Sequence, residues 1–445
     1  MALLLVVLLS LAGGAMDVGI ASMRQDTLQQ NIDAAAKAAL TEGTDVDAKK
    51  MAETFTSLYP TQPGMTAPVF NVTTSINNGA RQVNITATSK VSTRFLNVID
   101  IPSITIRAST TTESTPVPME IALAMDVTPS MQGSMTALRT AATDLVDKLY
   151  TAAARIPGTS VRFAVVPFSD QINLGTRYKG KPWISYPADQ LTCKCTSIAP
   201  DTCTRDGESY TCYKCVAQET VCTANLTWLG CTGVRKPAYR TKISNADTNR
   251  YPGFISYEDQ TIQTVFTQCG PEISPLNDNK SQITTSINGL NSRTSGDTYL
   301  PTGFIWGWNM LTHEEPVTDA VSQADAVRLG VRKFLIFLSD GGNATVPDDN
   351  NGGFPAVSNP TDPAFLLKLA QANTDTRTLC TNMHTTNPEI EVYTILYRST
   401  DPATVKLLED CASSPANALL AANTNQLADA FVTIANSIQV PRLTK

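Results

Sequence analysis

From Met119 onward, apolar runs that read as buried strands alternate with stretches of helical spacing. The strand-like runs include EIALAMD, VRFAVVPFS, RKFLIFLSD and EIEVYTILYR, and the helical stretches include SMTALRTAATDLVDKLYTAA, DPAFLLKLAQAN and TNQLADAFVTIANSI. Strands that alternate with helices form units in which a parallel sheet carries helices on both faces. The sequence therefore predicts an α/β fold with a doubly wound, mainly parallel sheet over residues 117–440. Ligands of such sheets bind beyond the carboxyl ends of the strands.

The alternation is interrupted at residues 173–293, a long region with no regular pattern. The chain has ten cysteines, and all but Cys380 and Cys411 lie in this region: Cys193, Cys195, Cys203, Cys212, Cys215, Cys222, Cys231 and Cys269. An irregular piece of this length inside a compact domain is usually functional or separately stabilised, and disulfides supply about 2–4 kcal/mol each. We therefore expect a disulfide-rich insertion of unassigned pairing, and a separate disulfide between Cys380 and Cys411.

The cysteines also indicate the compartment. Disulfides persist in oxidising compartments, so a chain with two even-numbered groups of cysteines is expected to be exported. Zinc is the alternative, because Cys193-Lys-Cys195 and Cys212-Tyr-Lys-Cys215 have the spacing of metal ligands. The irregular spacing of the whole group and the apolar start of the chain favour disulfides.

The first residues, MALLLVVLLSLAGGAM, carry no charge before Asp17, and no basic residue occurs before Arg24. About 20 apolar residues can span a bilayer, so residues 1–23 are predicted to be a transmembrane or signal-anchor segment. A cleaved signal peptide is the alternative. The retained anchor is favoured because residues 24–59 continue in a helical pattern. This helical segment forms either a stalk or an amphipathic helix that rests on its own domain.

Residues 60–116 have a different texture. PVFNVTTSI, RQVNITATSKVSTRFLNV and PSITIRASTTT are rich in Val, Ile and Thr, and their apolar residues alternate with a period of two. Asn77-Asn78-Gly79 reads as a turn between two of these strands. We expect a small β-rich segment ahead of the α/β domain.

Composition narrows the function classes. A net charge of -6 without a basic run argues against a nucleic-acid partner. The chain has only two histidines, His313 and His384, which disfavours a His-ligated zinc enzyme or a His general base. We therefore expect a protein that is not an enzyme. An oxygen-ligated metal hydrolase is the alternative, with Asp297 and Asp340 as catalytic groups, although no motif supports it.

Oxygen-bearing side chains gather at connections that follow strands or precede helices. They are Asp126, Thr128, Ser130, Asp297, Thr298, Thr302 and Asp340. Carboxylate and hydroxyl oxygens suit hard divalent cations such as Mg2+, Ca2+ or Mn2+ better than zinc. We expect the hydroxyls of Thr128 and Ser130 to bind such an ion, and Asp126 and Asp340 to neutralise it. Helix capping is the rival interpretation, because Asp, Thr and Ser are also preferred N-caps.

The chain order of these residues resembles the metal-ion-dependent adhesion site (MIDAS) of von Willebrand factor type A domains. The matching residues are Asp126, Thr128, Ser130, Thr298 and Asp340, with Thr302 as the alternative to Thr298. The resemblance implies a Rossmann-like doubly wound sheet with Mg2+, or Mn2+ or Ca2+, at its upper edge. It also implies that the three hydroxyls are ligands and that the two carboxylates mostly support them. Thr128 stands where the family pattern usually has Ser.

Stretches along the whole chain are similar to TadE/TadG-like proteins of the bacterial tight-adherence (Flp) pilus-assembly machinery. They include GGAMDVGIASMRQDTLQQNIDAAAKAAL, LPTGFIWGWNML, LLEDCASSPANALLAANTNQLADAF and the ending IANSIQVPRLTK. In that family a single N-terminal membrane helix precedes a periplasmic region. The resemblance implies a single-pass protein of the bacterial inner membrane, with most of the chain in the periplasm or at the cell surface. The cysteine-rich insertion has no counterpart in the pattern.

The two resemblances together imply a pilus-assembly or adhesion protein. A protein partner, drawn from pilus-assembly or envelope components, would offer an Asp or Glu carboxylate to the bound ion. Two alternatives stay open: the ion merely ties loops together, or the site is empty. In either case the protein would be a structural scaffold of the envelope.

Overall fold

A computed structural model describes most of the chain. The described residues are 2–40, 45–60, 62–77, 80–114, 117–154, 159–188, 190–192, 195–205, 208–218, 223–243, 249–255, 258–259, 264–265, 269–294, 296–354, 361–386 and 388–439. The chain forms two compact units. The first comprises Met1–Pro118, Asp147–Ser160 and Asn436–Lys445, and the second comprises Met119–Val146 and Val161–Ala435.

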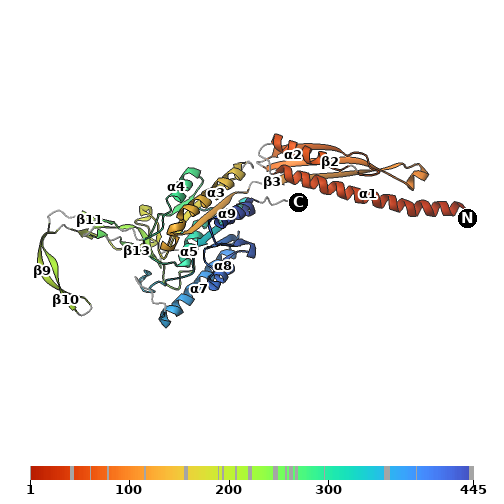
Figure 1. Ribbon diagram of the computed structural model, residues 1–445. Coiled ribbons are helices and arrows are strands. Elements are labelled where there is room, and N and C mark those ends of the chain that lie inside the picture. Colours follow the sequence, from red (N-terminus) through yellow and green to blue (C-terminus); the bar gives the residue numbers. More distant parts are fainter. Residues whose placement is uncertain are drawn as a thin grey trace. The chain divides into compact units, whose positions relative to one another are not determined.

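The first unit is a long helix and a short helix on a three-stranded antiparallel sheet of order β1-β2-β3 (Figure 1). Its elements are α1 (Ala2–Leu40), α2 (Asp45–Ser57), β1 (Val69–Asn77), β2 (Ala80–Ser92), the 3-10 helix η1 (Leu96–Ile99) and β3 (Ser103–Ser114). Helix α1 buries Leu28, Ile32 and Ala39 at helical spacing in one core with Val83 and Ile85 of β2. The second half of α1 therefore rests on its own sheet. Asn78 and Gly79 of the expected turn lie outside the described residues.

Residues 2–23, which the sequence marks as a membrane segment, form the first part of α1. The membrane span is not confirmed, because no helix in the described part of the chain is both long enough and apolar enough to cross a bilayer. The side chains of residues 1–12 lie outside the described part.

The second unit is built on a six-stranded sheet of order β16-β5-β4-β17-β18-β19. Its strands are β4 (Met119–Asp126), β5 (Val161–Phe168), β16 (Ser274–Asn277), β17 (Arg332–Ser339), β18 (Ile390–Tyr397) and β19 (Ala418–Ala421). Only β16 of these six runs antiparallel to its neighbour. The predicted α/β class with a mainly parallel sheet is confirmed.

Helices cover both faces of this sheet. The helices that the structure describes from β4 onward are α3 (Met135–Ala154), α4 (Lys280–Asn288), α5 (Leu300–Leu311), α6 (Gln323–Leu329), α7 (Pro363–His384), α8 (Pro402–Cys411) and α9 (Thr424–Gln439). Helices α5, α7 and α8 share a core with Ala122 and Ala124 of β4. The alternate strand residues Ile121 and Leu123 are fully buried but lie outside that core, so they face the opposite helical layer.

Between β5 and β16 the chain forms small sheets and turns. Their elements are β6 (Ile172–Asn173), η3 (Thr176–Tyr178), β7 (Ile184–Ser185), β8 (Gln190–Thr192), β9 (Cys195–Arg205), β10 (Glu208–Gln218), β11 (Thr223–Leu226), β12 (Trp228–Thr232), β13 (Tyr251–Ile255), β14 (Glu258–Asp259) and β15 (Thr264–Val265). The insertion ends earlier than residue 293, because β16 pairs with β5 and α4 packs on both of these strands. Strand β16 has only four residues and contains Pro, which suits an edge strand and weakens its sequence signal.

Two disulfides are formed by described residues. Cys380 of α7 is bonded to Cys411 of α8, which confirms the expected pair. Cys231 of β12 is bonded to Cys269. For the other six cysteines, either the position or the side chain lies outside the described part: Cys193, Cys195, Cys203, Cys212, Cys215 and Cys222. The zinc alternative concerns these cysteines, so it lies outside the described part too.

Candidate metal centre

The predicted site lies where the winding of the sheet reverses. From β4 the chain continues through α3 to β5 on one side, whereas β17, β18 and β19 follow one another on the other side. Asp126 ends β4, and Asp340 directly follows β17, the parallel neighbour of β4. The crevice beyond the carboxyl ends of strands at such a reversal is the usual ligand position in open α/β sheets.

Asp126 organises the loop that leaves β4. Its side chain is fully buried, and its Oδ1 accepts hydrogen bonds from the backbone N–H of Thr128 at 2.9 Å and the Thr128 hydroxyl at 2.6 Å. The other oxygen, Oδ2, accepts a bond from the Ser339 hydroxyl at 2.6 Å. Thr128 is also the N-cap of η2 (Pro129–Ser134), but its side chain makes no capping bond. The Thr128 hydroxyl therefore serves the site and does not cap the helix.

Thr128 and Ser130 bring their hydroxyl oxygens within 3.0 Å of each other. Thr128 Oγ1 also contacts Asp126 Oδ1 at 2.6 Å, and Ser130 Oγ contacts Asp340 Oδ1 at 2.9 Å. Each hydroxyl has a single proton, so three contacts share two protons. When both carboxylates are ionised they take both protons, and the lone pairs of Thr128 and Ser130 then face each other. A cation satisfies such a pair of oxygens.

The charges of the two aspartates also favour a bound cation. Burial, together with the charge of Asp340, raises the pKa of Asp126 to about 6. Burial also raises the pKa of Asp340, although its hydrogen bond from Ser130 opposes the shift. Ser130 is exposed, so the pair of carboxylates opens to solvent on that side. Hydroxyl and carboxylate oxygens fit Mg2+, Mn2+ or Ca2+, and a divalent charge would relieve the repulsion between the two aspartates.

Thr298 is held close to the loop that follows Asp340, but its side chain is not joined to the other candidate ligands. Its carbonyl oxygen accepts a hydrogen bond from the Ala344 N–H at 2.9 Å, and the nearby Leu300 N–H donates to Asn343 Oδ1 at 2.8 Å. Thr298 is 6% exposed, and its hydroxyl makes no hydrogen bond to any described residue. The structure thus links the two loops through their backbones and leaves this hydroxyl uncommitted.

The other two oxygen-bearing residues of that segment are engaged elsewhere. The Thr302 hydroxyl donates to the carbonyl oxygen of Asp170 at 3.0 Å in a buried position. Burial, followed by the charge of Asp170, raises the pKa of Asp297, whereas Arg293 lowers it. The Thr302 hydroxyl is thereby used, which favours Thr298 of the two.

The sequence does not identify Ser339 and Arg398 as residues of the site. Ser339 is buried beside Asp126, and only its place next to Asp340 in LSDGG could have indicated it. Arg398, directly after β18, has a left-handed backbone with φ of 57° and an exposed side chain. Its Nη1 donates to Ser134 Oγ in η2 at 3.2 Å, and its charge lowers the pKa of Asp340. No motif marks this contact between β18 and η2.

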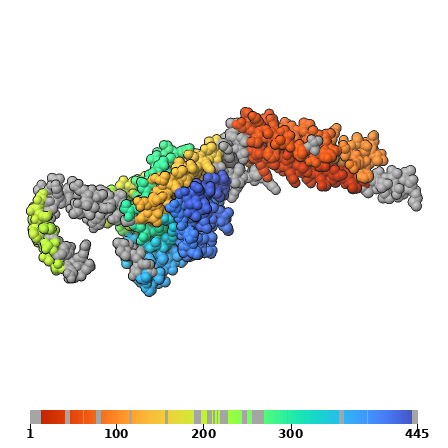
Figure 2. Space-filling view, in the orientation of Figure 1, coloured from red at the N-terminus to blue at the C-terminus, as the bar shows by residue number. Residues whose placement is uncertain are grey.

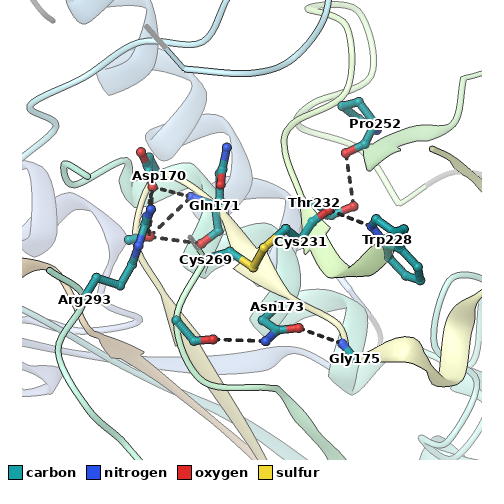
Figure 3. The surroundings of a disulfide bond; sticks show 12 residues. Asp170, Gln171, Asn173, Gly175, Trp228, Cys231, Thr232, Pro252, Cys269 and Arg293 are labelled. Carbon is teal, nitrogen blue, oxygen red and sulfur yellow. Dashed lines mark hydrogen bonds and ion pairs between the residues drawn. A yellow bond between two sulfur atoms is a disulfide. The ribbon is translucent and has the colours of Figure 1, made fainter. Parts of the chain in front are cut away.

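Residues that flank the insertion on both sides pack next to this loop. Arg293, after α4, donates its backbone N–H to the Val127 carbonyl at 2.7 Å, and its guanidinium forms an ion pair with Asp170, which precedes the insertion (Figure 3). Gly270, beside the Cys231–Cys269 disulfide, leaves room for Val127, because an added Cβ would lie 3.3 Å from the Val127 side chain. The end of the insertion, at Gly270, therefore contacts the loop that holds the candidate metal ligands.

No other candidate metal centre emerges from the described residues, among which no group of three or more His, Cys, Asp or Glu side chains could hold an ion. The arrangement at Asp126 depends on hydroxyls as well as carboxylates: it is an oxygen-lined cluster at the reversal of a doubly wound sheet and the candidate cation site.

No protein-family model and no curated protein matches the chain. It is similar to solved structures that include the pilus adhesin SpaC from Lactobacillus rhamnosus GG, at 12% identity over 85% of this chain and 34% of that chain, with a TM-score of 0.37. Another is the adhesive tip pilin GBS104 from Group B Streptococcus agalactiae, at 10% identity over 83% and 68%, with a TM-score of 0.36. A third is proximal thread matrix protein 1 from the mussel byssus with a zinc-occupied MIDAS motif, at 11% identity over 75% and 48%, with a TM-score of 0.32.

The chain spans less than half the length of SpaC and of the thread matrix protein. The ligands of those proteins are properties of those proteins and are not assigned to this chain. These likenesses are too weak to assign a function, which rests on the geometry of the site.

Proposed function

We propose that the protein binds a divalent cation, Mg2+ or in its place Mn2+ or Ca2+, and through it a carboxylate of a protein partner. Asp126, Thr128, Ser130, Thr298 and Asp340 would hold the ion. The observation that carries the proposal is the contact between Thr128 Oγ1 and Ser130 Oγ at 3.0 Å, because their protons are claimed by two aspartates. When bound, the ion supplies an open coordination position for an Asp or Glu oxygen.

The protein's own residues would leave that position free for a partner. Asp126 is buried behind Thr128, to which it is hydrogen-bonded, and Asp340 is bonded to Ser130. Both carboxylates can therefore act through hydroxyls, and neutral ligands leave more positive charge for an incoming carboxylate. The role would be adhesive or assembly-related and would not involve catalysis.

We also propose the finer identity, a TadE/TadG-like pilus-assembly protein held in the bacterial inner membrane by residues 1–23. Its support is the uncharged run before Asp17 together with the quoted sequence stretches. The two disulfides suit an oxidising compartment such as the periplasm. Flotation of the full chain with liposomes tests the anchor: a chain that stays in the aqueous fraction has no membrane anchor.

A structural scaffold is the second candidate function. It is favoured when one of the two aspartates is protonated, because the hydrogen bonds among Asp126, Thr128, Ser130 and Ser339 then close a network without an ion. The positive charge of Arg398 next to Asp340 also works against a bound cation. In this case the site would be empty, or an ion would only tie the loops together.

Titration with Mn2+, followed by electron paramagnetic resonance, separates these functions. The wild-type protein is expected to bind one Mn2+ that EDTA removes, and Thr128→Val, which keeps the shape but removes the hydroxyl, is expected to weaken binding at least about tenfold. Thr374→Val on the exposed side of α7 is the matched control and should bind as the wild type does. Absence of Mn2+ binding in the wild type would refute the cation site.

Acetate then distinguishes an adhesive ion from a structural one. Bound Mn2+ with exchangeable waters enhances the relaxation of water protons, and acetate is expected to reduce that enhancement by displacing a water. If Mn2+ binds but acetate has no effect at any concentration, the ion is structural and the scaffold function is preferred.

A further inference from the structure

Exposed apolar side chains are concentrated in the connection between β2 and β3. Phe95, Val98, Ile99 and Ile101 are 41%, 72%, 51% and 44% exposed, and all lie within or beside η1. Single exposed apolar residues are ordinary, but such a cluster in one short connection indicates a contact surface. Figure 2 shows the connection, in orange, at the surface of the first unit.

Helix α1 adds to the same region. Met16, Ile20 and Met23 are 61%, 44% and 70% exposed. They are spaced by four and three residues, so they form one stripe along the helix. The stripe and the η1 connection are hereafter called the apolar rim.

The η1 connection is fixed to α1 at one point. The Asp17 side chain is 4% exposed, and its carboxylate accepts the backbone N–H groups of Arg94 at 3.1 Å, Phe95 at 2.8 Å and Leu96 at 2.8 Å. These donors stand at the start of η1, where a helix leaves its N–H groups without internal partners. Gly14 permits close approach, since an added Cβ would lie 2.9 Å from Leu96 Cδ2.

This attachment point coincides with a change along α1. Residues 2–16 contain no charged side chain, Asp17 is the first charge of the chain, and the helix runs unbroken from Ala2 to Leu40. The η1 connection therefore meets α1 where its uncharged segment ends, and the exposed stripe starts at the same level and runs on to Met23.

We propose that the apolar rim rests in the interface of a lipid bilayer, with Val98 and Ile99 inserted below the headgroups. The continuity with residues 2–16 selects lipid as the occupant. Interfacial elements bury apolar side chains about 5–10 Å into the boundary of headgroups and acyl chains. Arg94, exposed beside the rim, has a long stem that allows its charge to reach the headgroups. The inference rests on the proposed membrane location of residues 1–23 and is independent of the metal centre.

Tryptophan fluorescence tests the insertion. The four native tryptophans, Trp183, Trp228, Trp306 and Trp308, are buried in the second unit. The full chain carrying Val98→Trp is incorporated into liposomes of phosphatidylethanolamine and phosphatidylglycerol, with or without bromine on the acyl chains. Bromolipid is expected to quench most of the added emission, which should also be blue-shifted.

The matched control is Val46→Trp, at a residue 77% exposed at the start of α2. Its emission is expected to stay unquenched. Liposome flotation is recorded for every sample. Chains that float while Trp at position 98 is unquenched would refute the rim contact and leave the anchor standing, whereas chains that do not float would refute both. Sedimentation of the Val98→Trp protein shows whether it forms oligomers. If it does, and bromolipid does not quench the added Trp, the rim contacts a second copy of the chain and the lipid contact is overturned.

Discussion

Glu120 of β4 and Lys333 of β17 face each other across neighbouring strands, and their side chains are only 1% and 2% exposed. Lys333 Nζ lies 2.8 Å from Glu120 Oε2 and also donates to the carbonyl oxygens of Leu311 at 2.7 Å and Val321 at 2.9 Å. Arg162 of β5 donates to the other Glu120 oxygen at 2.8 Å. The cluster fixes the chain segment that follows α5 at the amino ends of the strands, at the opposite end from Asp126 and Asp340.

Removing the lysine charge should destabilise the second unit. We expect Lys333→Met to lower its free energy of unfolding by about 3–5 kcal/mol, because Glu120 stays buried and loses the more deeply buried of its two cationic partners. Urea denaturation measures the change. Lys406→Met, at an exposed lysine paired with Asp410, is the control and should cost no more than about 1 kcal/mol. Equal losses in the two variants would show that the buried pair contributes nothing beyond a surface pair.

The buried carboxylate of the candidate metal site should lower the stability of the metal-free protein at neutral pH. Burial and the charge of Asp340 raise the pKa of Asp126 from 3.8 to about 6. A raised carboxyl pKa means that the folded state holds the proton more tightly, so the resulting stability is present below pH 3.8 and lost as pH rises through about 6. In EDTA at pH 7.5, we expect Asp126→Asn to be more stable than the wild type by up to about 3 kcal/mol.

The reorganisation that this substitution requires is small. Ser339, which donates to Asp126 Oδ2, also lies 2.8 Å from the Gly341 carbonyl and can turn its hydroxyl there. Urea midpoints at pH 7.5 and pH 4 measure the effect, which should disappear at pH 4. Asp144→Asn, at an exposed position of α3, should show no such dependence on pH. A metal-free Asp126→Asn protein that is less stable than the wild type at pH 7.5 would contradict the prediction.

Arg398 should weaken cation binding. Its charge acts on Asp340, lowering the pKa of that carboxyl, and it must also repel a cation bound there. We expect Arg398→Ala to tighten Mn2+ binding by about threefold to tenfold, since an exposed charge contributes on the order of 1 kcal/mol at this range. Arg328→Ala, at an exposed arginine paired with Asp325, should leave the affinity unchanged. Weaker Mn2+ binding in Arg398→Ala would show that the arginine supports the site by holding η2 through Ser134.

The sheet could be predicted because its central strands are buried on both faces and therefore read as continuous apolar runs. Strands β4, β5, β17 and β18 all have this character. Strands β16 and β19 have four residues each and lie at the sheet edges, and segments this short are too brief to show a strand pattern in the sequence. The sequence could not show where the insertion ends, because β16 is identified only by its pairing with β5.

The residues of the candidate site also fall into those that the sequence could predict and those that it could not. The spacing of Asp126, Thr128 and Ser130 is local, so the sequence contains it, and the apolar strand before Asp340 places that residue at the same sheet edge. Ser339 and Arg398 enter only through the order of the strands, which puts β17 beside β4 and β18 beside β17. Apart from the place of Ser339 next to Asp340, nothing in the sequence marks a serine or an arginine at the end of a strand for that role.

Asp17 should control the order of the η1 connection in the first unit. Its carboxylate satisfies the N–H groups of Arg94, Phe95 and Leu96, so Asp17→Ala leaves three donors without a partner, at a cost of about 1–3 kcal/mol for each buried group. We expect hydrogen exchange of these amides to accelerate at least about tenfold, since that corresponds to roughly 1.4 kcal/mol of lost protection. Asp17→Asn retains one acceptor oxygen and should restore part of the protection. Asp26→Ala, at an exposed position on the same helix, is the control. Unchanged exchange in Asp17→Ala would mean that packing of Leu96 on Gly14 alone holds the connection.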